Sequence, residues 1–351
     1  MHMKNFTIMK RTTTIAMIFL FISSFAGATV WRVNNTAGVS ADFTSVTTAH
    51  SAANPGDTLY LEPSATAYGN LSLTKKLVII GNGYFTNQNP ETQADINYSN
   101  LSVVTFNPGS EGSVIQGCKV YYISVRTSDI VIQRNYISYN TESAASIIFN
   151  EDNISNIIIR GNYIENTFYT HIYPYPDSEV IKSDRNGVNN VIISNNIIKS
   201  ADLDSEHRAL YLSSGFSGLI ENNVVYGHSY VNNAELNNNI WRDGTLSMTN
   251  CEWHNNIGNS SQFGEENGNK SNITMESVFV GEGSNDGQWQ LKEFSPAIGA
   301  GVGGIDCGVF DGAFPYVLSG IPPIPSVYEF THDIDYQNQK IEVEISVKSN
   351  N

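Results

Sequence analysis

The chain has little positive charge and few cysteines. Of its 351 residues, 19 are Lys or Arg and 34 are Asp or Glu, so the formal net charge is −15. An acidic surface repels phosphate backbones, and nucleic acid is therefore not expected as a partner. Three cysteines cannot all pair, and no Cys/His spacing indicates a zinc site. Cys118 and Cys251 lie in strand-like stretches, which favours buried, unpaired thiols over a disulfide.

Long apolar runs are also missing, except near the N-terminus. There, Lys10 and Arg11 precede an apolar run over residues 15–25, and residues 26–28 (Ala-Gly-Ala) supply a small-x-small cleavage pattern. Residues 1–28 are therefore predicted to be a secretory signal peptide. The run is shorter than the ~20 residues that a membrane anchor needs. We expect a mature chain without a membrane span, secreted to the periplasm or the extracellular space.

The chain does contain a repeated sequence motif: β-branched residues, two small or polar residues, an asparagine and another apolar residue. Strict and looser copies place the following residues at the asparagine position: Cys118, Asn135, Asn162, Asn196, Asn223, Asn239 and Asn256. The steps between them are 17, 27, 34, 27, 16 and 17 residues, with a mean of 23. Self-similarity at this period indicates a solenoid in which each copy is one coil.

A second apolar stretch precedes the asparagine strand in the longer coils, at residues 147–149, 180–181 and 210–212. Two or three short parallel strands per coil describe an all-β, right-handed parallel β-helix, in which each strand pairs with its counterpart one coil away. Asparagines at an inward bend can hydrogen-bond to the same residue in neighbouring coils. We therefore expect coils over residues 70–260 with one buried asparagine ladder.

Segments of different composition flank the coils. Asp42 is placed to cap a short helix through Ala53, which would close the first coil's open end. Proline and glycine are dense over residues 295–325, which favours an irregular C-terminal cap. Alternating apolar residues over 341–347 predict a strand buried on one face. The expected organisation is a signal peptide (1–28), a β-helix with two caps (29–330) and a C-terminal strand packed on the β-helix end (331–351).

The segments at the two ends carry a family resemblance. They are residues 42–46, the Pro55–Thr58 turn, residues 75–84, and the closing residues 295–299 and 305–308. With the coils, they resemble the pectin-lyase-like right-handed parallel β-helix superfamily, and most of all its uncharacterised exported members from Bacteroidetes-type bacteria. The resemblance covers nearly the whole mature chain. It implies the fold, which hosts lyases, hydrolases, esterases, adhesins and phage tail-spikes alike.

One stretch resembles a more specific group. Residues 179–183 and 208–215 are similar to the alginate lyase and chondroitinase B family, in which a lysine acts as base and an arginine on the next coil assists. The resemblance implies that role for Lys182, but the arginine and histidine positions of the family are Ser213 and Ser214 here. The polygalacturonase signatures, paired aspartates and Gly-His-Gly, are absent from the sequence.

Basic residues nearby could replace the missing catalytic arginine and histidine of that family. Lys182, His207 and Arg208 would form a catalytic group able to abstract a proton next to a uronate carboxylate, provided that adjacent coils bring them together. Since no complete catalytic set is present, this remains the alternative to a site that only binds.

Coil lengths point to a binding cleft. The steps of 27, 34 and 27 residues are consecutive, and their extra length falls after the asparagine strand and before the following one. Insertions at one turn of neighbouring coils stack on one side and wall off a cleft. The predicted substrate-binding residues are Tyr169, His171, Tyr173 and Tyr175. Aromatic faces suit sugars; the alternative is that these tyrosines pack within their own loops.

A short acidic motif offers a metal site. Asp202, Asp204 and Glu206 alternate, and carboxylates at alternate positions can supply oxygen ligands to Ca²⁺. The motif lacks the glycine turn and downstream glutamate of an EF-hand loop, which favours a solvated acidic loop instead. No other cofactor is expected.

The sequence thus predicts an exported, monomeric β-helix protein that binds carbohydrate, in a glycan-binding or surface-adhesion role. The first alternative is a polysaccharide-degrading enzyme, lyase- or hydrolase-like, acting in the cleft beside the long turns. The second is a structural or protein-binding solenoid.

Overall fold

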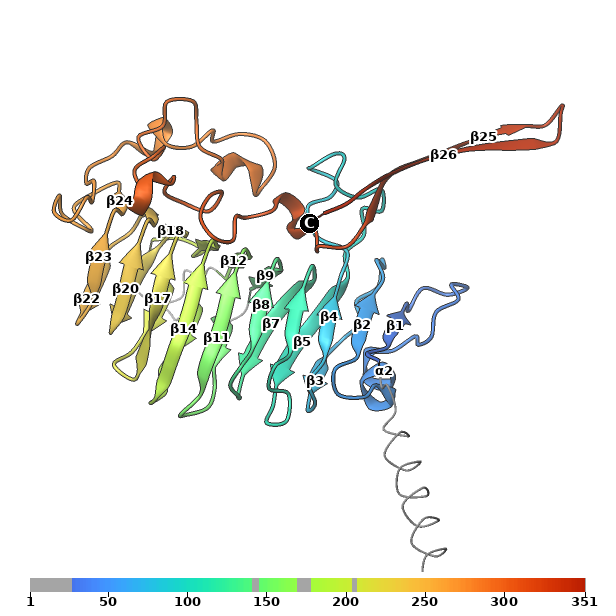
Figure 1. Cartoon of the computed structure of the whole chain (residues 1–351), viewed down its shortest axis with the longest axis horizontal. Coiled ribbons are helices and arrows are strands. Elements are labelled where there is room, and N and C mark those ends of the chain that lie inside the picture. Colours follow the sequence, from blue (N-terminus) through green and yellow to red (C-terminus); the bar gives the residue numbers. More distant parts are fainter. Residues whose placement is uncertain (1–26, 141–144, 169–177, 204–206, 351) are drawn as a thin grey trace, which may run out of the picture.

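The computed structural model of the chain describes residues 27–140, 145–168, 178–203 and 207–350. These residues form a right-handed parallel β-helix, a stack of coils whose strands run parallel to those of the next coil (Figure 1). The predicted fold class is therefore confirmed. Alternating side chains explain it locally: Ile157 and Ile159 are fully buried, whereas Ile158 between them points outward and is only half-buried.

One wall of the β-helix is a sheet of ten strands within the described residues. In order along the sheet these are β1 (Val30–Val33), β2 (Thr58–Leu61), β4 (Val78–Ile80), β6 (Val114–Gln116), β8 (Val131–Gln133), β11 (Ser155–Arg160), β14 (Val188–Ser194), β17 (Phe216–Glu221), β20 (Ala234–Asn237) and β23 (Glu252–His254).

The second sheet has two wings, which are joined because β7 pairs with both β9 and β10. The β9 wing consists of β9 (Tyr136–Tyr139), β12 (Tyr163–Asn166), β15 (Ile197–Lys199), β18 (Val224–Tyr226), β21 (Ile240–Asp243) and β24 (Ile257–Gly258). The β10 wing consists of β3 (Leu71–Leu73), β5 (Asn100–Phe106), β7 (Lys119–Val125), β10 (Ala145–Phe149), β13 (Ser178–Ser183), β16 (His207–Leu212), β19 (His228–Asn232) and β22 (Leu246–Thr249).

The asparagine ladder lies at the bend between the ten-stranded sheet and the β9 wing. Its members Asn135, Asn162, Asn196 and Asn223 are fully buried. The side-chain oxygen of each accepts from the ladder residue one coil earlier: Asn162 Oδ1 lies 2.9 Å from the main-chain N and 3.2 Å from Nδ2 of Asn135. Each Nδ2 also donates to buried main-chain carbonyls, so the bend leaves no ladder amide unsatisfied. The predicted ladder is confirmed.

A short helix closes the N-terminal end of the core. Helix α2 (Val46–Ala52) packs Val46 and Ala49 onto the first coil. Its N-cap is Ser45, whose side chain accepts from the Thr47 N–H, and not the predicted Asp42. Asp42 instead accepts from the main-chain N–H of Arg32 at 2.8 Å, which fixes the loop before the helix.

The C-terminal segment closes the other end and then turns back. Phe263 is buried at that end, with its ring 5.6 Å from that of Trp241. Short 3₁₀ turns follow at Met275–Ser277, Gly287–Trp289, Val302–Gly304 and Leu318–Gly320. Residues 300–325, called the strap from here on, run along the outside of the stack toward the first coils (Figure 1). The sequence analysis expected this Pro/Gly-rich segment to cover the C-terminal end of the β-helix. It instead continues along the outside of the stack.

The strap binds to one corner of successive coils. Immediately before each ladder asparagine lies a residue with positive φ, such as Asn195 at 54° and Asn222 at 53°. Their side chains donate to strap carbonyls: Asn195 Nδ2 to Val309 O at 3.0 Å and Asn222 Nδ2 to Gly308 O at 3.3 Å. Arg134, in the same position of an earlier coil, donates to Ile321 O at 3.0 Å.

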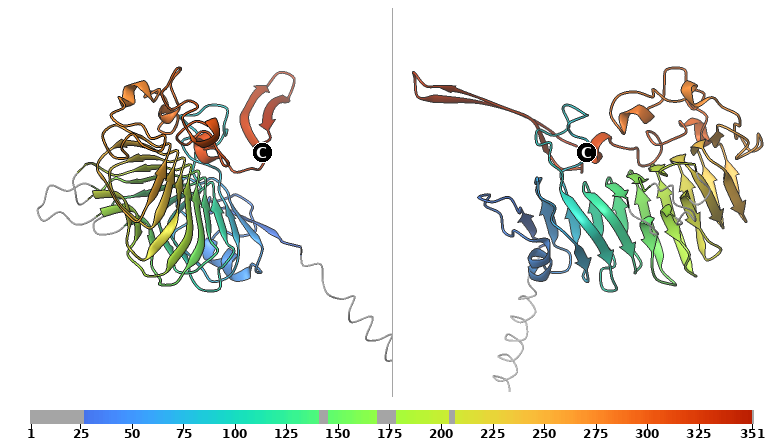
Figure 2. Two further views of the ribbon diagram at one scale, coloured as in Figure 1. Left: turned by 60° about the vertical axis from the view of Figure 1, so that its left-hand side comes forward. Right: turned by 180° about the vertical axis from the view of Figure 1, so that it is seen from behind.

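The chain ends in a long antiparallel ribbon, β25 (Ser326–Asp335) and β26 (Lys340–Lys348), which extends away from the coils (Figures 1 and 2). The predicted strand is present, but it pairs with β25 and does not pack on the β-helix end. Its apolar side chains are exposed, Ile341 at 67% and Val347 at 64%. The alternating pattern identified a strand correctly and did not reveal what covers its apolar face.

Two smaller expectations concern cysteines and membranes. Cys118, Cys251 and Cys307 are all free thiols, as predicted, and Cys118 and Cys307 are buried. Within the described residues, no helix has both the length and the apolar character to span a membrane.

Candidate functional site

A column of side chains on the outer face of the β10 wing combines cations with tyrosine rings. Parallel register aligns Lys182 of β13, Tyr211 of β16, Tyr230 of β19 and Ser247 of β22. Residues on either side of Lys182 and Tyr211 along their strands are buried, so the column itself faces outward. We call Lys182, Arg208, Tyr211 and Tyr230, with Glu179 beneath them, the cationic tyrosine column.

The two cations share one carboxylate. Glu179 is 1% exposed, and its oxygens lie 3.4 Å from Lys182 Nζ and 3.4 Å from Arg208 Nη1. The side chains of Lys182 and Arg208 remain 21% and 25% exposed. The buried carboxylate fixes both cations at the surface.

Aromatic rings continue the column. Lys182 Nζ lies 5.7 Å, and Arg208 Cζ 5.3 Å, from the centre of the Tyr211 ring, within the range of cation–π attraction. Tyr211 stacks on Tyr230 with centroids 5.8 Å apart and ring planes inclined by 24°. Tyr230 is 40% exposed, and its neighbour in the next coil, Ser247, is exposed and too small to cover the ring.

The predicted catalytic group is only partly assembled. Lys182 and Arg208 meet at Glu179, whereas His207 is fully buried, and its Nδ1 lies 2.7 Å from Asp202 Oδ1. Adjacent residues of a strand point to opposite faces, so His207 cannot join Arg208 at the surface. The expected three-residue cluster is therefore wrong for His207.

The predicted calcium ligands are mostly outside the described residues. Asp204 and Glu206 lie there, and the Asp202 carboxylate contacts His207. Across the described ranges, no group of three His, Cys, Asp or Glu side chains is arranged to hold a metal ion.

The predicted sugar-binding residues Tyr169, His171, Tyr173 and Tyr175 also lie outside the described residues. The connections that carry the three insertions can still be located from their ends. They join β9 to β10, β12 to β13 and β15 to β16, and so all leave the β9 wing and enter the β10 wing. The insertions thus share one turn, next to the wing that bears the cationic tyrosine column.

A second tyrosine cluster lies where the β9 and β10 wings join, between β9 and β7. The sequence analysis expected Tyr139 and Asn140 on the cleft wall but did not identify their partners Tyr121 and Tyr122. The Tyr139 ring lies 4.9 Å from that of Tyr121 and 6.0 Å from that of Tyr122, and Tyr121 Oη donates to Asn140 Oδ1 at 2.8 Å. Beside it is a pocket of about 500 Å³ lined by Asn100, Leu101, Ser102, Val103, Lys119, Tyr121, Ser138 and Asn140. The available signal was the Tyr-Tyr pair in β7, one coil before the first insertion.

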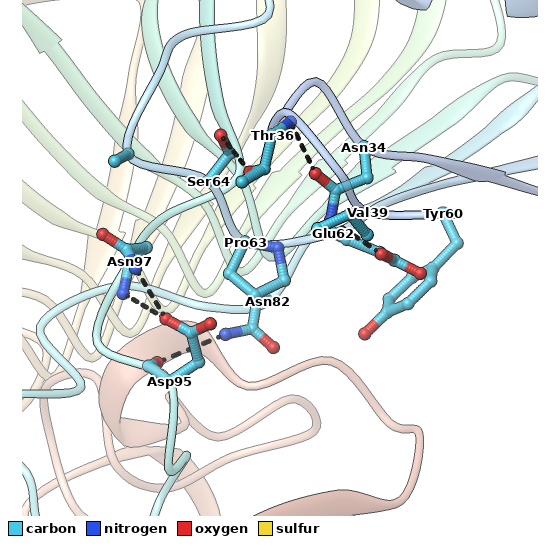
Figure 3. A pocket seen from close by; sticks show the side chains of 11 residues that line it. Asn34, Thr36, Val39, Tyr60, Glu62, Pro63, Ser64, Asn82, Asp95 and Asn97 are labelled. Carbon is cyan, nitrogen blue, oxygen red and sulfur yellow. Dashed lines mark hydrogen bonds between the residues drawn. The ribbon is translucent and has the colours of Figure 1, made fainter. Parts of the chain in front are cut away.

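Another pocket lies near the N-terminal end, remote from the column in the coil order. It measures about 430 Å³, and its wall includes Tyr60, Glu62, Asn82 and Asp95 (Figure 3). Its carboxylates are already engaged: Glu62 with Arg32 and Asn34, and Asp95 Oδ1 with both nitrogens of Asn97. The Glu62 contacts join β1 and its following loop to the end of β2, and the Asp95 contacts close a local turn, so both carboxylates already have partners in the pocket wall.

No protein-family model matches the chain, and no curated protein matches its sequence.

Proposed function

We propose that this chain is an exported β-helix protein of the pectin-lyase-like type that binds carbohydrate on the outer face of its β10 wing. The observation that carries the proposal is the cationic tyrosine column. A tyrosine ring offers an apolar face to the C–H groups of a pyranose, and neighbouring polar groups take its hydroxyls. Tyr230, with one ring face toward small Ser247, provides such a surface.

The charges around the column narrow the ligand class. The protein as a whole is acidic, which disfavours strongly anionic polysaccharides. Lys182 and Arg208 are both partly exposed cations, which would tolerate a sugar with a single carboxylate at that point. The proposed ligand is therefore a neutral or weakly charged glycan, and the second tyrosine cluster and its pocket would contact the same chain along the wing.

One observation favours an enzyme as the second candidate. Lys182 and Arg208 lie on adjacent coils, as a polysaccharide lyase would require. Against it, Lys182 Nζ is already engaged with the buried Glu179 carboxylate. His207 is fully buried against Asp202, so the group expected from the sequence is incomplete. Binding without turnover therefore remains the proposal.

A glycan array on the mature protein, with Ca²⁺ and with chelator, tests the proposal. Tyr230→Ala should weaken binding by ~0.5–1.5 kcal/mol, about the value of one aromatic contact. Tyr336→Ala is the matched control, because Tyr336 is 83% exposed at the far tip of the ribbon. New unsaturated ends that disappear in Lys182→Ala would instead establish the lyase. An array on which nothing binds would favour a structural or protein-binding solenoid.

A further inference from the structure

The β25–β26 ribbon has two chemically different faces. In an antiparallel pair, directly opposed residues lie on the same face. The register therefore defines an apolar ribbon face made of Val327, Phe330, His332, Ile334, Ile341, Val343, Ile345 and Val347. The opposite face carries five carboxylates, those of Glu329, Asp333, Asp335, Glu342 and Glu344, and the two lysines Lys340 and Lys348.

The apolar ribbon face is not covered by the described part of the chain. Phe330 is 55%, Val343 51% and Ile345 56% exposed. Only the base of the ribbon is fixed, where the Ala94 N–H donates to Val327 O at 2.8 Å and Ser326 Oγ donates to Thr92 O at 3.2 Å. A two-stranded ribbon in water is at best marginally stable unless its apolar face is packed against something. The alternating sequence is thus typical of a strand with one buried face, but the described part of a single chain leaves that face exposed.

We propose that the apolar ribbon face is covered by the same face of a second copy of this chain, in a two-fold symmetric dimer. The distribution of charged side chains over the two ribbon faces favours this partner. The apolar face has no carboxylate, and all five carboxylates of the opposite face would point outward from the pair. Pairing through strand edges would align the acidic faces of two ribbons and leave the apolar faces in water. The dimer replaces the monomer that the sequence analysis expected.

Charge also selects the orientation of the two ribbons. Each chain has a formal net charge of −15, most of it on the coils and their loops. Antiparallel ribbons place the base of one against the tip of the other and keep the two coil stacks a ribbon length apart. That length, ~30 Å for nine residues, exceeds the screening length of ~8 Å at physiological salt. Repulsion between the stacks is then screened.

The area of the face sets the strength of the dimer. A face of roughly 30 Å by 10 Å is smaller than the roughly 800 Å² that each partner gives to a standard stable interface. The dimer should therefore be weak, with a dissociation constant on the order of 10–100 µM.

Sedimentation velocity on the mature chain over roughly 1–500 µM brackets that constant. The wild type should shift from monomer to dimer across this range. Val343→Gln/Ile345→Gln, on the apolar face, should raise the dissociation constant at least tenfold. Glu342→Gln/Glu344→Gln is the matched control on the opposite face and should leave it unchanged or lower it. A wild type that stays monomeric throughout, or a control pair that weakens association equally, would overturn the proposal.

Hydrogen–deuterium exchange of the wild type guards against variants that merely unfold the ribbon. Amides of residues 326–348 should exchange more slowly at high than at low protein concentration, and those of the coils should not change. Concentration-dependent protection elsewhere, with none in the ribbon, would place the contact on another surface and refute the proposal. Neither measurement involves a glycan, so the outcome is independent of the proposed carbohydrate function.

Discussion

At the scale of single residues, the ladder asparagines have the least freedom to change. The Asn196 side chain accepts nothing from solvent: its Nδ2 donates to Ile159 O and Asn223 Oδ1, and its Oδ1 receives two N–H groups of Asn162. Asn196→Ala should lower the free energy of unfolding by ~1–3 kcal/mol, because buried main-chain groups lose their partners. Chemical denaturation measures this.

Asn189→Ala is the matched control for that substitution. It lies in the same coil, has ordinary φ, and its exposed side chain can exchange its hydrogen bonds for water. Equal stability losses in the two variants would contradict the special role of the ladder.

The sequence revealed the ladder because every copy repeats one residue type in one apolar context. The sequence did not reveal the role of the residue before each ladder asparagine. That position is filled by Arg134, Gly161 or Asn195, which share only a positive φ.

At the candidate site, Lys182 and Arg208 both contact Glu179, and their proposed roles stay predictions. The inclusion of His207 was wrong. Alternation counted back from the outward Tyr211 would place His207 on the outer face. The register is irregular between Arg208 and Leu210, however, Ala209 and Leu210 are both buried, and His207 points inward.

At the scale of elements, the strap depends on residues that tolerate the left-handed bend. Asn195 has φ of 54° and donates to Val309 O and Asp311 O. Asn195→Ala loses both bonds and strains the bend by ~1–2 kcal/mol, whereas Asn195→Gly loses only the bonds. We expect stability to fall in the order Asn, Gly, Ala, with faster proteolysis of residues 300–325 in both variants. An alanine variant as stable as the wild type would show that the bend carries no strain.

The coils could be predicted from their period, but the strap and the ribbon's exposure could not. The strap has neither repeat nor apolar alternation, and its contacts join residues far apart in sequence, such as Ile321 and Arg134. The ribbon has clear alternation, yet a pattern only states that a face avoids water. It does not identify what covers that face.

At the scale of the whole molecule, buried phenols make the fold sensitive to alkali. Burial raises the pKa of Tyr68 from 10.0 to about 12, and burial likewise raises the pKa values of Tyr84 and Tyr316 well above 10.0. Above pH 10 the unfolded chain releases these protons and the folded chain keeps them, so the unfolded state binds fewer protons and stability falls with rising pH.

The measurement is the denaturation midpoint against pH, together with tyrosinate absorbance. Stability should be constant below about pH 9 with respect to these groups and decline from pH 10 upward. Tyr68→Phe should flatten the decline, whereas Tyr336→Phe, at an exposed position, should not. A decline of unchanged steepness in Tyr68→Phe would rule out the assigned contribution.

The strap has a mechanical consequence as well. Tension on the ribbon would first break the contacts of its base with Thr92 and Ala94 and then reach the strap at Ile321. The strap's bonds to Arg134, Asn195 and Asn255 would follow in that order. Each step breaks only a few hydrogen bonds, together with the packing of buried strap side chains such as Val309 and Tyr316. Residues 300–326 would add up to ~90 Å of extension before the coils begin to unfold. In a single-molecule pulling trace, release of the strap would appear as a separate extension before the steps of coil unfolding. The strap would thus take up the first part of a load applied to the ribbon before the β-helix unfolds.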